Sequence, residues 1–557
     1  MNDSLPLPTT YPEDSAVTGM AHKSRLLAAG LWPYLLAAVM VTLLRVPTLT
    51  NRILSIDEAS YLVHALRLRS LEAFVFAFVY RAETKTQLGL VPYMLANALD
   101  RSNALLLVHV FGLVAAIVGC VLIIKIAWRF AGALLAGLAA SAVWAIYLVV
   151  GPGYPQPANL DGYTFFQAPR LEYFQTPFLL AAVYWFLFGC EVEAYPDSRR
   201  RATNLLFLAG LCWSIAALIK PSAALFGLPL LFALPLLITT GRRLTGALRR
   251  GGAMLAGAAL PVVLVFAPYL FHPSGIEALR FSFTELSSQY AEKGDHKARV
   301  LELLTGLSPM FLAAFVLTLG VALVGTFVYR RHTDLLMSFR LPALMGMLAI
   351  ALFVGMVPGQ GHVYYLVPAV PFMALTITCT LASVIRRLAS RRGRGLAWGA
   401  ALLIAVTYLG TNIEALIKYP EQTLHDAYLA RDRRRFNLDG LVAYIKSTTP
   451  HDGTMWVYYN TPELFVLSER LPVTLDPAGI WLDYIWSEPW FQRIAADLAA
   501  ERPHLIIGIN RPRYHYPHTS PLLEVPVVGD WIKRNYICDA HLIRGVVVCK
   551  RPDLGRP

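Results

Sequence analysis

Residues 28–58 read AAGLWPYLLAAVMVTLLRVPTLTNRILSIDE, and this stretch decides the fold. Its first part, residues 28–46, is almost entirely apolar, and a helix needs about 20 such residues to cross a bilayer. A basic segment, His22 to Arg25, precedes it, and no small-residue cleavage site follows it. We therefore expect a retained membrane anchor rather than a cleaved signal peptide. Just beyond this span lies the acidic pair Asp57–Glu58.

The composition extends the same pattern to the whole chain. Its 557 residues are 56% hydrophobic and only 15% charged, in long apolar blocks separated by short basic clusters. This pattern is typical of a polytopic α-helical membrane protein. The net charge of +13 does not indicate a nucleic-acid partner. The basic residues lie between apolar blocks, whereas nucleic-acid binding favours one basic face or tail.

The apolar blocks predict about eleven spans, and up to thirteen, because residues 88–99 are a candidate for a short additional membrane helix. The blocks after the first are residues 105–124, 131–150, 174–190, 205–219, 223–239, 254–271, 310–328, 341–357, 365–384 and 397–409. Residues 47–87 form the first loop of the membrane domain, residues 28–413. This loop contains amphipathic segments such as residues 61–71, which we expect to lie along the membrane interface.

Basic clusters orient the chain, because short loops rich in Lys and Arg stay in the cytoplasm. Such clusters recur between alternate pairs of spans, at residues 199–201, 242–250, 330–331 and 386–394. We therefore expect a plasma-membrane (inner-membrane) protein with residues 1–27 in the cytoplasm and the C-terminal region outside. The loop that carries Asp57 then shares the outer face with Lys220 and with the loops at residues 151–170, 272–299 and 358–362.

The tail, residues 414–557, is more polar and predicts a small α/β domain. Helices are expected at residues 436–447 and 491–500, and strands at residues 454–459 and 505–509. Cys538 and Cys549 flank a hairpin-like segment, and an oxidising outer compartment would permit a disulfide between them. The tail aromatics are interpreted as core or as sugar-stacking residues; they are Trp481, Tyr484, Trp486 and Trp490.

Several short motifs together resemble the GT-C glycosyltransferases, which use polyprenyl-phosphate sugars. In layout the chain is similar to the lipid A aminoarabinose transferases and the protein O-mannosyltransferases. One departure is clear: Thr86–Gln87 stand where the aminoarabinose transferases have two prolines after Glu–Lys. The tail resembles the family only in layout. The motifs are IDEASY (residues 56–61), ETK (83–85), PRLEY (169–173), ALIKP (217–221) and HVYYLVPAVP (362–371).

The resemblance implies transfer of a sugar from a polyprenyl phosphate, such as undecaprenyl phosphate, to a lipid, glycan or protein acceptor on the outer face. It also implies inversion at the anomeric carbon. Asp57 is the candidate general base, a role that typically contributes about 10²–10⁴-fold. Glu58 is either a catalytic helper or a cap of the following helix. Glu172 is a candidate second acid or orienting group, and Asp161 competes with it for that role.

The departing lipid phosphate needs cations, and Lys85, Lys220 and Arg280 are the candidates. Lys220 at a helix end is equally consistent with snorkelling, and Arg280 with an ordinary surface position. His362, Tyr364 and Tyr365 are candidate sugar- or phosphate-binding residues or part of an interfacial aromatic belt. The resemblance is compatible with a divalent metal, but no cluster with metal-ligand spacing is visible, so neither a metal nor a cofactor is predicted.

Two rival classes share many of these features. A transporter or lipid flippase of envelope biogenesis would also have many spans and a few intramembrane charges. The sequence shows no inverted repeat and no symmetric pair of broken helices, which disfavours a carrier. The second rival is a non-catalytic subunit of an envelope-assembly complex.

Overall fold

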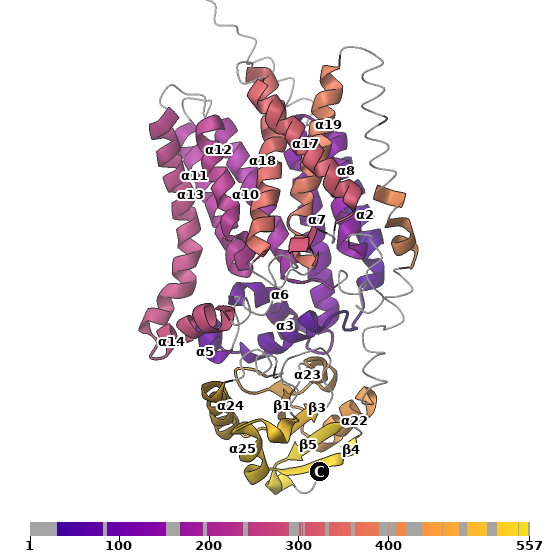
Figure 1. The fold of residues 1–557 in the computed structure, drawn as a ribbon, viewed down its shortest axis with the longest axis vertical. Helices are drawn as coiled ribbons and strands as arrows, with labels where there is room; N and C mark the ends of the chain where they lie inside the picture. Colours follow the sequence, from indigo (N-terminus) through magenta and orange to yellow (C-terminus); the bar gives the residue numbers. More distant parts are fainter. Residues whose placement is uncertain are drawn as a thin grey trace, which may run out of the picture.

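The computed structural model describes residues 30–81, 86–151, 168–192, 198–237, 243–288, 300–301, 303–304, 307–328, 333–357, 363–388, 399, 408–410, 412–418, 437–458, 461–477, 479, 487–509, 521–543 and 545–554. A bundle of long helices makes up most of the molecule, and a small domain built on a five-stranded sheet is attached at one end of it (Figure 1). Between the two lie the short helices of the first loop.

The bundle helices coincide with the first ten apolar blocks expected from the sequence, and most of the eleventh, residues 397–409, lies outside the described residues. They are α2 (Trp32–Arg45), α7 (Ala104–Ala131), α8 (Leu134–Val150), α10 (Leu171–Val192), α11 (Arg199–Ile219), η4 (Pro221–Phe226) with α12 (Gly227–Leu237), α13 (Arg243–Phe266) with η5 (Ala267–Phe271), α17 (Pro309–Val328), α18 (Thr333–Met356) and α19 (Val370–Arg387). Within the described residues, 7 helices are long and apolar enough to cross a membrane, and three apolar helices are shorter. The chain is a multi-pass membrane protein, and the span count of about eleven remains a prediction.

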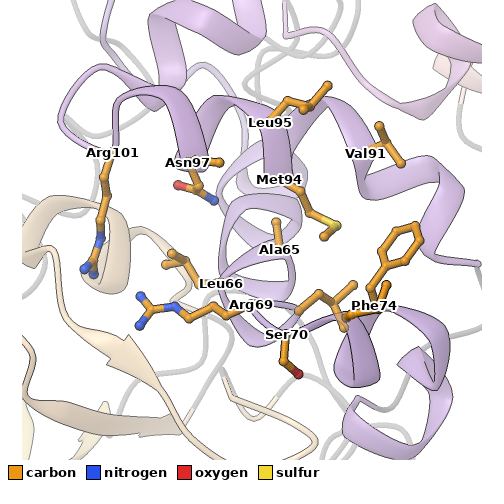
Figure 2. Close-up of a pocket in the computed structure, with 13 residues that line it drawn as sticks. Ala65, Leu66, Arg69, Ser70, Phe74, Val91, Met94, Leu95, Asn97 and Arg101 are labelled. Carbon is orange, nitrogen blue, oxygen red and sulfur yellow. The ribbon is translucent and has the colours of Figure 1, made fainter.

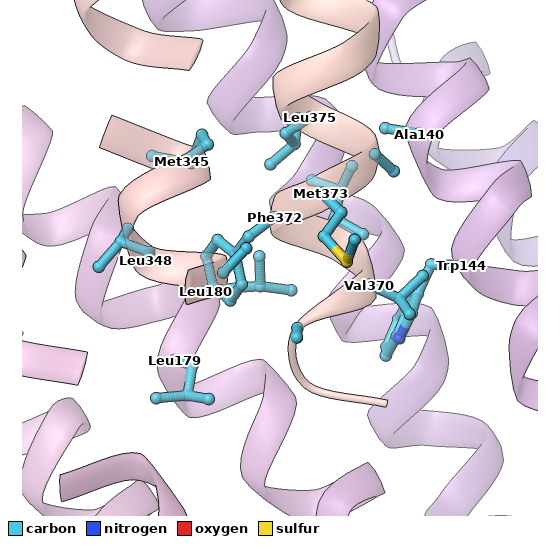
Figure 3. Close-up of a cluster of buried hydrophobic side chains, with 14 of the residues drawn as sticks. Ala140, Trp144, Leu179, Leu180, Met345, Leu348, Val370, Phe372, Met373 and Leu375 are labelled. Carbon is cyan, nitrogen blue, oxygen red and sulfur yellow. The ribbon is translucent and has the colours of Figure 1, made fainter. Parts of the chain in front are cut away.

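The centre of the bundle is filled by large apolar side chains from helices distant in sequence. Trp144 of α8, Leu180 of α10, Met345 of α18 and Phe372 of α19 are all buried (Figure 3). The Trp144 indole N–H donates to the carbonyl of Val367, 3.2 Å away, so its polar atom is also satisfied. This packing fixes the segment before α19 against α8.

The first loop folds into short helices between the bundle and the C-terminal domain (Figure 1). They are α3 (Ile56–Arg67), α4 (Leu71–Val75), α5 (Ala77–Tyr80), η2 (Gln87–Leu90) and α6 (Val91–Leu99). The amphipathic helix expected over residues 61–71 is thus present as α3 and the start of α4. Helix α6 has 9 residues, about 14 Å in length. It is too short to cross the bilayer, so residues 88–99 do not add a span.

The C-terminal domain has the α/β architecture predicted for the tail. Its elements are α22 (Leu438–Thr448), β1 (Thr454–Tyr458), α23 (Glu463–Ser468), β2 (Leu471–Pro472), α24 (Glu488–Glu501), β3 (Leu505–Ile509), η8 (Leu522–Glu524), α25 (Val528–Asn535), β4 (Ile537–Ile543), β5 (Val546–Lys550) and η9 (Pro552–Leu554). The strand order is β2-β1-β3-β5-β4, parallel through β3 and antiparallel beyond it. Cys538 and Cys549 face each other across the β4–β5 pair and form a disulfide.

The domain packs directly on the first loop. The Arg67 guanidinium of α3 lies 3.1 Å from the Glu501 carboxylate of α24. Arg101, between α6 and α7, donates to the carbonyl of Glu469 at 2.7 Å. Trp490 is buried, which favours its interpretation as a core residue. Trp481, Tyr484 and Trp486 lie outside the described residues.

Two of the basic clusters, at Arg199–Arg201 and Arg386, lie at the far end of the bundle from this domain, whereas residues 330–331 lie outside the described residues. Arg199–Arg201 open α11, whereas the other end of α11 reaches Lys220 and the first loop. Arg386 donates to the carbonyl of Ala131, where α7 ends. Helix α7 begins beside α6, so Arg386 is again at the distant end. The two clusters therefore share one end of the bundle, and the placement of that end in the cytoplasm remains a prediction.

Candidate active site

Helix α3 begins with a capping arrangement that fixes both acidic residues. The Ser55 hydroxyl accepts a hydrogen bond from the backbone N–H of Glu58 at 3.2 Å. In return, the Glu58 carboxylate accepts from the backbone N–H of Leu54 at 3.0 Å. This is close to a capping box, and the Ser-x-x-Glu spacing that signals it is visible in the sequence. Of the two roles considered for Glu58, the structure favours the cap.

Glu58 is also joined to the bundle through His109 of α7. The carboxylate lies 2.6 Å from Nε2 of His109, and both side chains are fully buried. Nδ1 of the same ring lies 2.7 Å from the carbonyl of Thr50. A carbonyl only accepts, so Nδ1 carries a proton, and the contact to Glu58 requires a second proton on either group. The start of α3 is therefore tied to a spanning helix through a buried, protonated pair.

Asp57 points the other way and meets Arg170. One Asp57 oxygen lies 3.1 Å from Nη1 of Arg170. The Asp57 side chain keeps 29% of its surface exposed, whereas Arg170, immediately before α10, keeps 2%. Among the three candidate carboxylates in the described residues, Asp57 is thus the one that solvent or a substrate can reach. The buried guanidinium orients it.

Glu172 and Lys220 form a second ion pair beside the first. Glu172 opens α10, Lys220 follows the end of α11, and the carboxylate contacts the ammonium directly. Gln175 donates to the carbonyls of Ala216 and Lys220, each at 2.9 Å, which fixes the end of α11. The second carboxylate oxygen of Glu172, Oε2, is buried and receives no hydrogen bond from the described residues. It remains able to accept one from a ligand.

Two tyrosines cover both cations. Tyr364 and Tyr365 lie in η7 (Val363–Leu366), with their rings edge to face at 4.7 Å. The Arg170 guanidinium is 3.8 Å from the Tyr364 ring centroid, and the Lys220 ammonium is 3.3 Å from that of Tyr365. Such contacts stabilise cations in places with little water. Five of the candidate residues therefore lie around one common site: Asp57, Glu172, Lys220, Tyr364 and Tyr365.

Tyr61 and Tyr93, both in the first loop, pack beside this site. Their rings pack edge to face at 5.3 Å. The Tyr93 hydroxyl donates to the carbonyl of Pro169 at 2.6 Å, which holds the chain just before Arg170. Burial, and then the negative charges of Asp57 and Glu172, raise the pKa of Tyr61 well above its usual range. At neutral pH Tyr61 is therefore an uncharged hydrogen-bond donor near the two carboxylates.

The remaining candidates have different outcomes. Lys85, Asp161 and His362 lie outside the described residues. The segment directly after Lys85 reaches the site, because the Thr86 hydroxyl donates to the carbonyl of Leu218 at 2.6 Å. Arg280 is exposed at the end of α14 (Gly275–Arg280), which packs mainly against α5, η5 and η6 (Phe281–Leu286). This location favours the surface interpretation of Arg280.

Sequence reasoning did not single out two central residues. These are Arg170, which is part of the PRLEY motif, and His109, which lies within an apolar block. An ionisable residue inside a span is itself a signal of function or of a buried partner, and that signal could have identified His109. The described residues contain no group of three or more His, Cys, Asp or Glu that could hold a metal ion.

No protein-family model and no curated protein sequence matches this chain. Solved structures do resemble it. The crystal structure of ArnT from Cupriavidus metallidurans in the apo state is 15% identical, with a TM-score of 0.53 over 95% of this chain and 100% of that one. ArnT bound to undecaprenyl phosphate is 16% identical, with a TM-score of 0.47 over 79% of this chain and 85% of that one.

The apo oligosaccharyltransferase from Archaeoglobus fulgidus is 10% identical, with a TM-score of 0.50 over 86% of this chain and 69% of that one. Both proteins are GT-C glycosyltransferases. The chain shares their fold, which confirms the fold expected from its motifs.

Proposed function

We propose that this protein is a membrane glycosyltransferase that takes a sugar from a polyprenyl phosphate and transfers it to an acceptor hydroxyl or amine on the outer face of the membrane. The observation that carries the proposal is the pairing of a reachable Asp57 with the buried Arg170, next to a second buried acid–base pair. The fold shared with ArnT and the archaeal oligosaccharyltransferase supports it. The structure of ArnT with undecaprenyl phosphate suggests that lipid as the carrier.

The chemistry that fits is a single displacement. The acceptor O–H or N–H attacks the anomeric carbon while its proton passes to the Asp57 carboxylate. The bond between the anomeric carbon and the phosphate oxygen breaks at the same time, and the polyprenyl phosphate leaves with the electron pair. The attack comes from the side opposite the leaving group, so the configuration at this carbon inverts.

The phosphate is assigned to the two cations beneath the tyrosines, Arg170 and Lys220. A guanidinium can bind a phosphate through two parallel hydrogen bonds, and an ammonium adds a point charge. Each cation already has a carboxylate partner, so the donor shares these contacts rather than meeting unpaired charges. Lys85 remains a third candidate, because Thr86 is anchored two residues from Lys220.

Glu172 is proposed to position a hydroxyl of the sugar or acceptor through Oε2, which is buried beside Lys220. A buried acceptor of this kind discriminates strongly against ligands that lack the matching donor. Asp161 keeps its competing role as a proposal. The side chains around this site select the sugar and the acceptor. The experiment below identifies both.

The test compares lipids and glycans, by mass spectrometry, from cells lacking the protein and from cells complemented with variants. Wild-type protein should restore a sugar that is missing in the deletion strain, and Asp57→Asn should not restore it. Glu72→Gln is the matched control, because Glu72 is an exposed carboxylate of the same loop whose contact is with Tyr80. Restoration by Asp57→Asn at normal protein levels would overturn the catalytic assignment. A strain that loses no sugar would favour the transporter class.

A further inference from the structure

A separate cavity of about 600 Å³ lies at the opposite end of α3 from Asp57. It is enclosed by the end of α3, by α4 and by α6 (Figure 2). The end of α3 at Arg67 follows Asp57 by 10 residues, which corresponds to about 15 Å along the helix, so this cavity is distinct from the candidate active site. Its lining residues are Ala65, Leu66, Leu68, Arg69, Ser70, Leu71, Phe74, Val91, Met94, Leu95, Asn97, Ala98 and Arg101.

The charged residues that line this cavity are both basic. Arg69 and Arg101 are on the same side of it in Figure 2, and none of its lining residues is acidic. Within the described part of the chain, Arg69 makes no hydrogen bond or ion pair. Burial is the main cause that lowers the pKa of Arg101, and the charge of Arg69 also lowers it, whereas the nearby Glu469 carboxylate raises it. Two guanidinium groups that repel each other in one cavity are best matched by an anion with several oxygen acceptors.

The other residues that line the cavity are mostly apolar, and the cavity opens to the surface between exposed leucines. Phe74, Val91 and Met94 line the interior. At the rim, the exposed fractions are 79% for Leu71 and 51% for Leu95. Leucines exposed to this degree beside a membrane domain are explained by contact with lipid, whereas a soluble anion would gain nothing from them. The two arginines together with the apolar lining therefore favour an amphiphilic ligand that has an anionic head and an apolar chain.

The cavity also continues towards the C-terminal domain. A smaller cavity of about 190 Å³ shares Leu66, Asn97 and Arg101 with it and reaches Leu467 and Glu469. The Glu469 carboxylate is already engaged by Lys446 at 3.3 Å and His451 at 3.5 Å. It therefore does not neutralise Arg69. A ligand at Arg101 would lie beside the contact that holds the C-terminal domain to the first loop.

We propose that this cavity binds an anionic membrane lipid, with its phosphate between Arg69 and Arg101 and one acyl chain along Phe74, Val91 and Met94. The occupant is a lipid of the surrounding bilayer rather than the sugar donor, because the site lies at the far end of α3 from Asp57. Its effect is structural: it covers the rim leucines and adds a charged contact beside the junction of the two domains. The proposal does not depend on the glycosyl-transfer assignment.

Native mass spectrometry of the full-length protein in detergent tests this proposal. The purified protein is incubated with equal amounts of phosphatidylglycerol and phosphatidylcholine that carry identical acyl chains. We expect retained phosphatidylglycerol to exceed phosphatidylcholine. Arg69→Gln should reduce phosphatidylglycerol retention about tenfold, because one charged hydrogen bond to phosphate is lost. Arg69 is the better position to change, since Arg101 also holds the Glu469 carbonyl.

Arg52→Gln is the matched control, because Arg52 is an exposed arginine of the same loop that does not line the cavity. It should leave retention unchanged. Met94→Trp fills the cavity and should reduce the retention of phosphatidylglycerol while the protein stays monodisperse. Equal retention of the two lipids would overturn the proposal, as would unchanged retention in Arg69→Gln. Full displacement of the lipid by inorganic phosphate would indicate a soluble anion and would equally overturn it.

Discussion

Arg170 holds Asp57 with one edge of its guanidinium, at 3.1 Å, while the face of the same group lies 3.8 Å from the Tyr364 ring centroid. The geometry uses both properties of a guanidinium, its directed N–H donors and its flat face. It couples the first loop, which carries Asp57, to the segment before α19, which carries Tyr364. Through these two contacts the guanidinium links Asp57 and Tyr364, which are about 300 residues apart in sequence.

Replacement of Arg170 by Lys should lower kcat by about 10–100-fold, because an ammonium cannot orient Asp57 and stack on Tyr364 together. Steady-state kinetics of transfer from the lipid-linked donor would measure this. Arg52→Lys, an exposed position in the same loop, should remain at wild-type activity. A fully active Arg170→Lys variant would show that the charge alone is sufficient.

Glu58 should tolerate Gln better than Ala. A glutamine can still accept from the Leu54 N–H and donate to Nε2 of His109, so it replaces both hydrogen bonds. Alanine leaves buried polar groups without partners, at a cost of about 3 kcal/mol. Thermal unfolding in detergent should therefore place Glu58→Gln near wild type and Glu58→Ala well below it. If Glu58→Gln is as damaging as Glu58→Ala, the pair requires its ionised form.

The Glu172–Lys220 pair should separate stability from activity. Lys220→Met leaves the Glu172 charge buried, which typically costs about 3–5 kcal/mol. Adding Glu172→Gln removes that charge and should recover much of the thermal stability. It should not recover glycosyl transfer, because the cation for the phosphate is still missing. Recovery of both properties in the double variant would assign the pair a purely structural role.

Glu463 gives the C-terminal domain a pH dependence. Burial raises the pKa of this carboxyl to about 8, from its ordinary value of 4.5. The folded protein therefore keeps a proton that the unfolded chain releases, and stability falls as pH rises from about 4.5 to 8. Above both values the effect is complete. Glu463→Gln should raise the unfolding temperature at pH 8 and flatten the profile across this window; an unchanged slope would contradict the shift.

The Cys538–Cys549 disulfide should be present in protein isolated from cells, if the tail is in an oxidising compartment. Alkylation before and after reduction, followed by mass spectrometry, would detect it. The bridge closes a short loop, with a sequence separation of 11. By chain entropy its removal in Cys538→Ser/Cys549→Ser costs about 3 kcal/mol. Two free thiols in freshly isolated protein would contradict the predicted orientation of the tail.

Local patterns predicted the elements of this fold well. Apolar blocks located the bundle helices, and the tail helix at residues 491–500 and the strand at 505–509 appear as α24 and β3. The two-residue strand β2 was not predicted, because a segment that short has no periodicity of its own. Its pairing with β1 depends on tertiary contact.

The site was predictable in its residue types but not in its pairs. Asp57, Glu172 and Lys220 were candidates because they lie in motifs that resemble those of the GT-C glycosyltransferases, and because a charge near a bilayer is costly. Which charge meets which was not visible, since the Asp57–Arg170 and Glu172–Lys220 contacts depend on how α3, α10 and α11 pack. Arg170 and Glu172 are two residues apart in sequence, but Arg170 precedes the start of α10 at Leu171 and Glu172 follows it. Their side chains therefore reach different partners.

Helix α3 packs against the C-terminal domain, so part of its packing must wait until that domain has been synthesised. About 370 residues separate the end of α3 from the start of α22. At about 5–20 residues per second, the ribosome needs roughly 20–70 s to supply the domain that covers this helix. Throughout that interval α3 has its partners within the first loop, such as α6, but not its partners α23 and β2 in the C-terminal domain. Packing of the first loop is therefore completed late, and a premature stop codon upstream of α23 would leave a membrane-inserted chain without these contacts.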